Sequence, residues 1–138
     1  MDRLYQQLIR DEGLELRPYV DTVGKLTIGV GRNLTDLGIT RDEANYLLHN
    51  DVERVITELN RVVPPSYADL LDTRKAVIIN MAFNMGVPRL MGFKKMLAAI
   101  ETGNYSEAAA EMLDSVWASQ VGDRARRLAR QMETGEWV

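Results

Sequence analysis

The chain has 138 residues, of which 46% are hydrophobic and 27% charged, and its formal net charge is −3. This composition is typical of one folded domain with a hydrophobic core, and the negative balance argues against nucleic acid as the main partner. The absence of cysteine and the single histidine, His49, exclude disulfides and thiolate chemistry and argue against a conventional zinc site.

The first predicted element is a helix over residues 2–12. Leu4, Leu8 and Glu12 recur at i, i+4 and i+8, which is the spacing of one helix face. Gly13 follows, and glycine ends helices at low conformational cost. Glu12 therefore closes an apolar stripe, and we expect its side chain to point inward rather than toward water.

A β-hairpin is predicted next, with strands near 17–20 and 25–30. The stretch RPYVDTVGKLTIGVG is rich in β-branched and aromatic residues and carries turn signals. A turn centred near Gly24 places Asp21 and Thr27 roughly opposite each other. The two later glycines of this stretch permit a bend or a close approach of the backbone.

A long helix is expected from about residue 40 to residue 61. Thr40 and Glu43 form the T-x-x-E capping box that marks a helix start, and apolar residues recur on one face after it. The sequence VVPPS ends the helix because proline cannot continue it. At roughly 30 Å, this helix is long enough to join a small β-containing lobe to the rest of the chain.

The remaining chain is predicted to be helical. A short helix at 66–71 precedes a buried central helix, RKAVIINMAFNM, which Asp72 or Thr73 caps and Gly86 ends. Further helices are expected near 93–101, 105–114 and 123–134, with Asp123 as the N-cap of the last one.

Basic residues are concentrated in two places. Five lie between Arg74 and Ile100, where there is no acid, and a second group lies between Arg124 and Arg130. Two interpretations are open: solvated helix faces, which are the usual case, or a surface that attracts a polyanion.

No run of about 18 apolar residues is present, and the N-terminus MDRLYQQLIRDEG lacks the apolar segment of a signal peptide. No membrane span is therefore expected. The protein is expected to stay in the cytoplasm until something else releases it.

Two carboxylates on separate elements are the equipment for glycoside hydrolysis. One is protonated and donates to the leaving oxygen, and the other is ionised and activates water or stabilises oxocarbenium charge. Glu12 suits the first role because the negative end of a helix disfavours another negative charge. Asp21, on a turn, suits the second, and Thr27 is placed to bond a water. On composition alone, with 20 acidic residues in the chain, structural roles remain the default for these acids.

The order of these residues resembles the tailed-phage lysozymes (endolysins) of glycoside hydrolase family 24, the family of T-even phage lysozyme. The matching motifs are E-G-L at 12–14, Y-x-D at 19–21, G-x-x-T-I-G-x-G at 24–31, GITRDEA at 38–44, RKAVIINMAFNMG at 74–86, and DRAR and TGEW near the end. The resemblance covers essentially the whole chain in the same order.

The resemblance implies cleavage of the peptidoglycan β-1,4 bond between N-acetylmuramic acid and N-acetylglucosamine, with inversion and without a cofactor. It assigns Glu12 as the general acid and Asp21 as the second carboxylate. Thr27 matches the cleft threonine, which together with Asp21 would position the attacking water.

Three further residues are assigned to substrate binding. Asn84 matches an amide side chain of the family's cleft, and Asn80 lies one turn before it; filling polar space in a buried helix is the alternative for both. Arg124 matches an arginine that faces the catalytic glutamate, so a close Glu12–Arg124 pair is expected, the alternative being an exposed first-turn residue. Trp117 is expected in the core rather than as a platform for sugar.

The chain departs from the family pattern in two places. The family often has histidine after the G-x-G, where this chain has Arg32, for which we expect Asp51 of the long helix as the ion-pair partner. The segment RNLTDLG before Thr40 is short, so the small lobe lacks a helix that some members carry.

We therefore expect an α+β, lysozyme-like fold in a single domain, 1–138. Residues 13–61 would form the small β-containing lobe and the spine helix, and 1–12 with 62–138 the helical lobe. The expected role is lysis of the bacterial wall by a monomer that leaves the host cytoplasm through a membrane pore and acts on peptidoglycan in the periplasm.

Two alternatives remain. A lytic transglycosylase cuts the same bond without water and needs no Asp21–Thr27 site. A non-catalytic wall-binding or structural protein on the same scaffold would need neither carboxylate.

Overall fold

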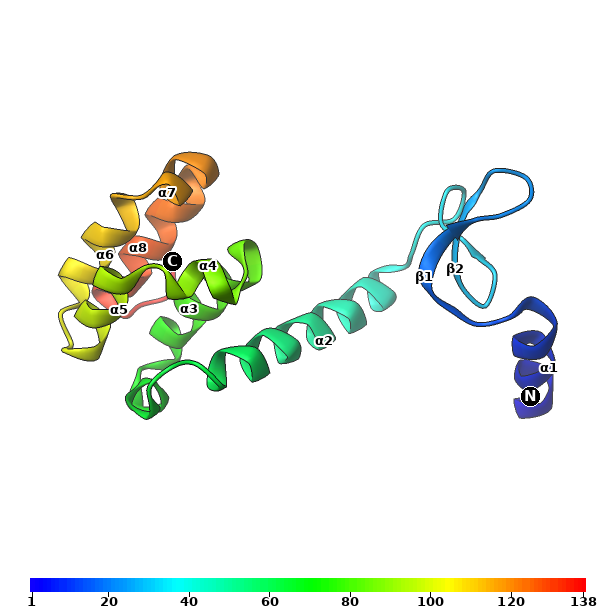
Figure 1. Cartoon of the computed structure of the whole chain (residues 1–138), viewed down its shortest axis with the longest axis horizontal. Helices are drawn as coiled ribbons and strands as arrows, with labels where there is room; N and C mark the ends of the chain where they lie inside the picture. Colours follow the sequence, from blue (N-terminus) through cyan, green and yellow to red (C-terminus); the bar gives the residue numbers. More distant parts are fainter. The chain divides into compact units, whose positions relative to one another are not determined.

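The computed structural model describes all 138 residues, with eight α-helices and one small antiparallel sheet (Figure 1). The α+β, lysozyme-like fold class is confirmed by this combination of elements. The chain divides into two compact units, residues 1–47 and 48–138. The assignment of residues 1–12 to the helical lobe stays a prediction.

The first unit begins with α1, Asp2–Glu12, which has the predicted bounds. Gly13 ends it with a φ of 82°, and its N–H donates to Ile9 O. A sheet in the order β1-β2-β3 follows, made of β1, Glu15–Val20, β2, Leu26–Gly29, and β3, Arg32–Asn33.

The register of the hairpin differs from the prediction. Thr27 pairs with Tyr19, and Leu26 pairs with Val20. Asp21 is therefore not opposite Thr27; its N–H donates to Lys25 O at 2.9 Å instead. The tight turn after β1 brings Asp21 and Lys25 together, so Thr27 lies two residues further along the opposing strand.

Helix α2, Arg41–Asn60, begins in the first unit and continues into the second. Its predicted capping box is confirmed: Thr40 Oγ1 accepts from Glu43 N at 3.1 Å, and Glu43 Oε1 accepts from Thr40 N at 2.9 Å. None of the helices of the protein combines the length and the apolar character that crossing a membrane requires.

The second unit is helical after α2. Its elements are the 3₁₀ helix η1, Pro65–Asp69, and the α-helices α3, Asp72–Met85, α4, Val87–Met91, α5, Lys94–Glu101, α6, Tyr105–Leu113, α7, Val116–Val121, and α8, Asp123–Thr134. The predicted helices are all present, η1 being the one expected at 66–71. Helices α4 and α7 were not predicted.

Two predicted N-caps are wrong. Leu71 precedes α3 without a side-chain cap, and the Thr73 hydroxyl donates to Gly135 O at 2.7 Å instead. Asp123 is the first residue of α8 rather than its cap, and its carboxylate pairs with Arg126 one turn later. In both places the side chain expected to cap the helix binds another partner: Thr73 binds Gly135, distant in the sequence, and Asp123 binds Arg126 three residues later.

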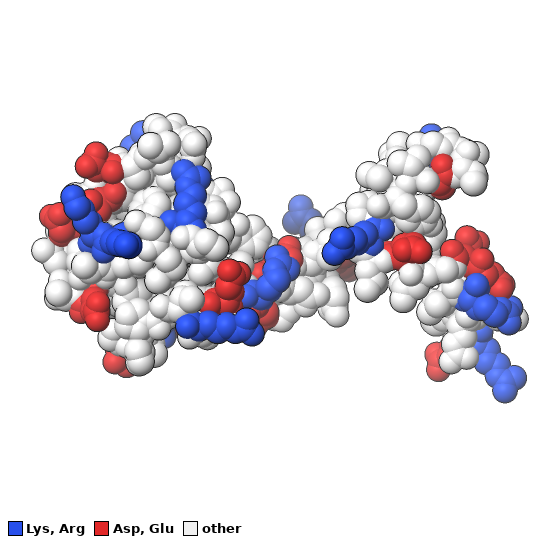
Figure 2. All heavy atoms as spheres, in the orientation of Figure 1, with Lys and Arg blue, Asp and Glu red and all other residues white.

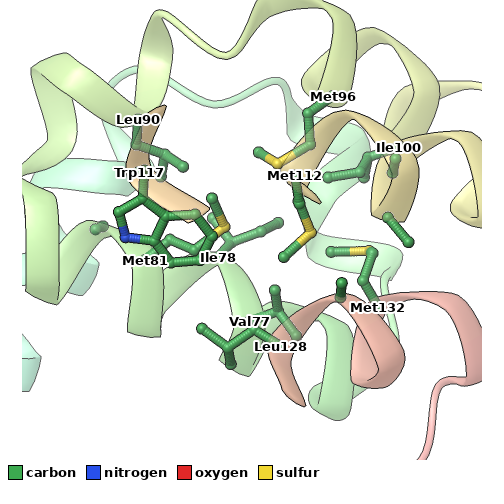
Figure 3. Close-up of a cluster of buried hydrophobic side chains, with 14 of the residues drawn as sticks. Val77, Ile78, Met81, Leu90, Met96, Ile100, Met112, Trp117, Leu128 and Met132 are labelled. Carbon is green, nitrogen blue, oxygen red and sulfur yellow. The ribbon is translucent and has the colours of Figure 1, made fainter. Parts of the chain in front are cut away.

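A hydrophobic core fills the second unit (Figure 3). Its largest fully buried side chains are Trp117, Met81, Leu90, Met96, Ile100, Met112, Met132 and Val77. The rings of Phe93 and Trp117 meet edge to face, with centroids 6.3 Å apart. Trp117 is 1% exposed, which confirms its predicted place in the core.

Polar side chains tie the end of α8 to α3. Arg74 Nε donates to Met132 O at 2.7 Å and Arg74 Nη2 donates to Glu133 O at 3.1 Å, while the guanidinium lies 3.6 Å from the centroid of the Tyr105 ring. A cation on the last carbonyls of a helix satisfies groups that lack intrahelical partners and opposes the negative end of the dipole. Helix α8, which carries Arg124 in its first turn, is thereby held at its other end.

Candidate active site

Glu12, the last residue of α1, lies beside the G-x-G segment of the hairpin. A Cβ added at Gly31 would lie 3.4 Å from Glu12 Oε2 and 3.8 Å from its Cδ, so the glycine leaves room for the carboxyl group. Gly31 has a φ of 73°, a region that glycine adopts readily. The close backbone approach that the glycines predicted is found here. No residue of α1 is buried within this unit, and the expected inward orientation of Glu12 stays a prediction.

Asp21 caps its own turn. Its Oδ1 accepts from Val23 N at 3.0 Å and from Lys25 N at 2.8 Å. Aspartate favours turns for this reason. These two bonds fix the direction of the carboxylate, and Oδ2 accepts no hydrogen bond from the protein.

Thr27, in β2, is the one buried residue of the first unit, at 3% exposed. Its hydroxyl donates to Lys25 O at 3.0 Å. The same carbonyl accepts from Asp21 N at 2.9 Å, and Lys25 N donates to Asp21 Oδ1. The peptide groups of Lys25 therefore hold Asp21 and Thr27 together, although the two residues are not strand partners.

Arg32 does not pair with Asp51 as predicted. Its Nη1 binds Glu43 Oε1 at 2.8 Å and donates to Gly38 O at 3.2 Å, whereas Asp51 pairs with Arg54 on its own helix. Glu43 is favoured because it stands in the first turn of α2, next to the hairpin. The Arg32 guanidinium and the Thr40 N–H lower the pKa of Glu43 to about 2, and the hydrogen bond to Glu43 raises the pKa of Arg32.

The same unit has a hollow of about 770 Å³ beside the G-x-G segment. It is lined by Ile28, Gly31, Arg32, Ile39, Tyr46 and Leu47, among others. As the short segment before Thr40 predicts, no helix lies between β3 and α2. The hollow therefore has an open, largely apolar surface.

In the second unit, the three predicted binding residues are engaged with other side chains. Asn80 Oδ1 accepts from Arg124 Nε at 3.1 Å and from Arg124 Nη2 at 2.8 Å. Asn84 Oδ1 accepts from Trp117 Nε1 at 2.8 Å. Arg124 is thus a half-buried, paired residue rather than an exposed one. The Glu12–Arg124 pair and the binding roles of these residues stay predictions.

The comparisons with known proteins decide the family. Residues 10–133 match the family model described as phage lysozyme. The chain belongs to the phage lysozyme family. This membership supports a peptidoglycan-hydrolysing enzyme.

Relatives of this phage lysozyme family member come from different sources. The "Probable T4-type lysozyme 1" of Dictyostelium discoideum is 33% identical over 91% of this chain and 90% of the relative. The "Endolysin" of Acyrthosiphon pisum secondary endosymbiont phage 1 is 30% identical over 75% of this chain and 70% of its own length. The "Pre-baseplate central spike protein Gp5" of Enterobacteria phage T4 is 30% identical over 94% of this chain but only 27% of Gp5.

This phage lysozyme homologue shows neither a continuous basic surface on the face seen in Figure 2 nor a cluster of metal-binding side chains. Figure 2 shows acidic side chains standing among the basic ones on the visible face of each unit, which favours solvated helix faces over a continuous basic surface. No group of three or more histidine, aspartate or glutamate side chains is placed to hold a metal ion.

Sequence reasoning missed two contributors to the site. Lys25 acts through its backbone, which no residue-type pattern reveals. Glu43 was recognised only as a capping residue, although the same oxygen, Oε1, also binds Arg32.

Proposed function

We propose that this chain is an endolysin that hydrolyses the β-1,4 bond between N-acetylmuramic acid and N-acetylglucosamine of bacterial peptidoglycan, with inversion at the anomeric carbon. The observation that carries the proposal is the shared Lys25 peptide, which joins Asp21 to Thr27. Family membership and a relative named endolysin support the substrate and the role in host lysis.

The hydrogen bonds determine how a water would be held. Thr27 gives its only hydroxyl proton to Lys25 O, so it meets a water as an acceptor. Asp21 Oδ2, which is free of protein donors, is an acceptor as well. A water that donates one hydrogen to each residue keeps a lone pair for attack on the anomeric carbon, and Asp21 takes up its proton.

Glu12 is the proposed general acid. Protonated Glu12 donates to the oxygen of the leaving sugar, and its place beside Gly31 leaves the carboxyl group room to approach that oxygen. Asn80, Asn84 and Arg124 are proposed substrate-binding residues. Because the oxygens of both amides are already used, their NH₂ groups are the donors available to sugar hydroxyl and acetamido oxygens.

Product analysis tests this function directly. Mass spectrometry of digested peptidoglycan is expected to show reducing N-acetylmuramic acid ends, and NMR of the first product the α-anomer. A 1,6-anhydro end would identify a lytic transglycosylase, a first-formed β-anomer would mean retention, and no soluble product would indicate a wall-binding protein.

The proposed cellular role has its own test. We propose that the enzyme acts as a monomer and waits in the host cytoplasm until a membrane pore opens. Produced inside cells without a pore-forming protein, the enzyme is expected to leave them intact, and permeabilising the cytoplasmic membrane is expected to cause lysis. Lysis without permeabilisation would contradict the need for release.

A further inference from the structure

Lys25 is the point through which the two water-binding residues are fixed. Its N–H holds Asp21 Oδ1, and its carbonyl holds both Asp21 N and Thr27 Oγ1. A displacement of this peptide therefore moves both acceptors together. What holds Lys25 and Leu26 in place consequently bears on the reaction.

The segment Asn33–Asp36 binds Lys25 and Leu26 through hydrogen bonds and an ion pair. Thr35 Oγ1 accepts from Leu26 N at 2.9 Å, and Leu34 N donates to Leu26 O at 2.7 Å. Asp36 Oδ1 binds Lys25 Nζ at 3.2 Å. A threonine hydroxyl thus substitutes for the strand partner that the two-residue β3 does not supply.

The segment Asn33–Asp36 is itself held by local hydrogen bonds. Asp36 Oδ2 accepts from Asn33 Nδ2 at 2.9 Å, and Asp36 N donates to Asn33 Oδ1 at 2.9 Å. Gly38 N closes the turn on Leu34 O at 3.0 Å. Because both carboxylate oxygens of Asp36 are bonded, the turn holds Thr35 and Asp36 in one geometry.

We propose that Thr35 and Asp36 are positioning residues for the hydrolytic step, which act through Lys25 and Leu26 on the Asp21–Thr27 pair. The inference rests on the proposed function, because it assigns these residues to the water site. Thr35 sets the strand position of Leu26, and Asp36 holds the Lys25 side chain. Neither residue is assigned a contact with the substrate.

Thr35→Val tests the proposal because it keeps the shape and removes the acceptor for Leu26 N–H. On soluble glycan strands of peptidoglycan, we expect kcat to fall about tenfold with KM within about twofold, since the water and not the sugar is misplaced. Amide exchange at Leu26 is expected to accelerate. Thr35→Ser, which keeps the hydroxyl, is expected to restore kcat. Thr22→Val is the matched control, because Thr22 is an exposed hairpin residue without a hydrogen bond.

A cycle with the double variant Asp21→Asn/Thr27→Ala separates positioning from general damage. If Thr35 acts through the Asp21–Thr27 pair, Thr35→Val should add less than about twofold to the loss caused by that double variant. A loss of the full tenfold in that background, or wild-type kcat in Thr35→Val, would overturn the inference. If Thr35→Val does not fold, Asp36→Asn, which loses the charge pair with Lys25, takes its place with the same criteria.

The two levels of the proposal fail differently. Wild-type kcat in both Asp21→Asn and Thr27→Ala would remove the proposed water site and this inference with it. Loss of activity in those variants but not in the Thr35 and Asp36 variants would remove this inference alone.

Discussion

Each of the two units of this protein is stabilised internally by a different kind of interaction. Every buried hydrophobic residue lies in residues 48–138, whereas Thr27 is the one buried residue of 1–47. The helical unit has the packed core of Figure 3. The first unit depends on turn hydrogen bonds, a capping box and the ion pairs of Lys25 and Arg32.

This difference separates chemistry from stability. The proposed acid and the proposed water-binding residues all lie in the unit without a hydrophobic core, where polar groups fix one another. Core packing supplies most of the free energy of folding, and preorganised polar groups supply catalysis. Substitutions in the two units should therefore affect different measurements.

The largest expected effect comes from Glu12→Gln. The amide keeps the shape of the side chain but donates no acidic proton, so we expect lysis to fall by about 10²–10⁴-fold. Turbidity of permeabilised cells measures it, with circular dichroism to show that the fold persists. Glu15→Gln, the same change at an exposed strand position, is the control. Lysis at the wild-type rate by a folded Glu12→Gln protein would end the assignment.

Met112→Ala should act on stability instead. Met112 is fully buried, and its loss leaves a cavity in the helical core, which typically costs about 2–5 kcal/mol of unfolding free energy. Urea unfolding measures this cost, and lysis at a temperature where the variant is folded should stay near wild type. The adjacent Leu113, 47% exposed on the same helix, provides Leu113→Ala as the control with a much smaller loss. Equal losses for the two variants would contradict the described core.

A smaller effect is expected from the glycines of the hairpin. Gly31→Ala and Gly29→Ala both place alanine at positive φ, at a cost of roughly 1 kcal/mol each. Only Gly31→Ala also puts a methyl group against the Glu12 carboxylate, because nothing lies within 4 Å of a Cβ at Gly29. We expect lysis to fall about threefold or more in Gly31→Ala relative to Gly29→Ala. Identical turbidity rates for the two proteins would show that the carboxyl group does not need this space.

The smallest effect concerns pH. In the folded state the pKa of Glu43 is lowered to about 2 by Arg32 and Thr40, from an ordinary 4.5. Ionised Glu43 therefore stabilises the fold above pH 4.5, and this contribution is lost as the pH falls from 4.5 toward 2. Both side chains of the pair are more than a third exposed, so the contribution is modest.

Glu43→Gln tests this contribution. The urea midpoint followed by NMR signals of residues 32–43 is expected to fall less with acid in Glu43→Gln than in the wild type. Asp42→Asn, the neighbouring acid without an ion pair, should keep the wild-type slope. If Glu43→Gln showed the same acid dependence as the wild type, Arg32 would not be the partner that matters.

Much of the fold was predictable because local signals agreed with the tertiary structure. The helix at 2–12 ends at a glycine with positive φ, and the box of Thr40 and Glu43 opens α2 as its spacing indicates. Helices α4 and α7 were missed because each has only five or six residues. In α4, Pro88 lies in the first helical turn, a position to which proline is well suited.

The residues of the site stay predictions, and the strand register that was expected to place Asp21 opposite Thr27 is wrong. The turn prediction put Asp21 opposite Thr27. In the structure the carboxylate of Asp21 binds backbone N–H groups of its own turn, and Lys25, not Thr27, is the residue opposite Asp21. The Arg32 prediction chose the acid that matched the family, and the structure chose the acid in the nearer helical turn. Distances of this kind depend on backbone geometry that a residue list does not contain.

The hydrogen bonds around Asp21 and Thr27 also have a consequence for the order of folding. They join residues no more than 11 apart, whereas the bond from Thr73 to Gly135 spans 62 residues. Closing the longer loop costs about 1.5 kcal/mol more chain entropy. During synthesis, all residues of the proposed water site have left the ribosome once Asp36 is clear, whereas the helical core also needs α8. The contacts of the proposed water site are thus local in the sequence, and those that close the helical unit are not.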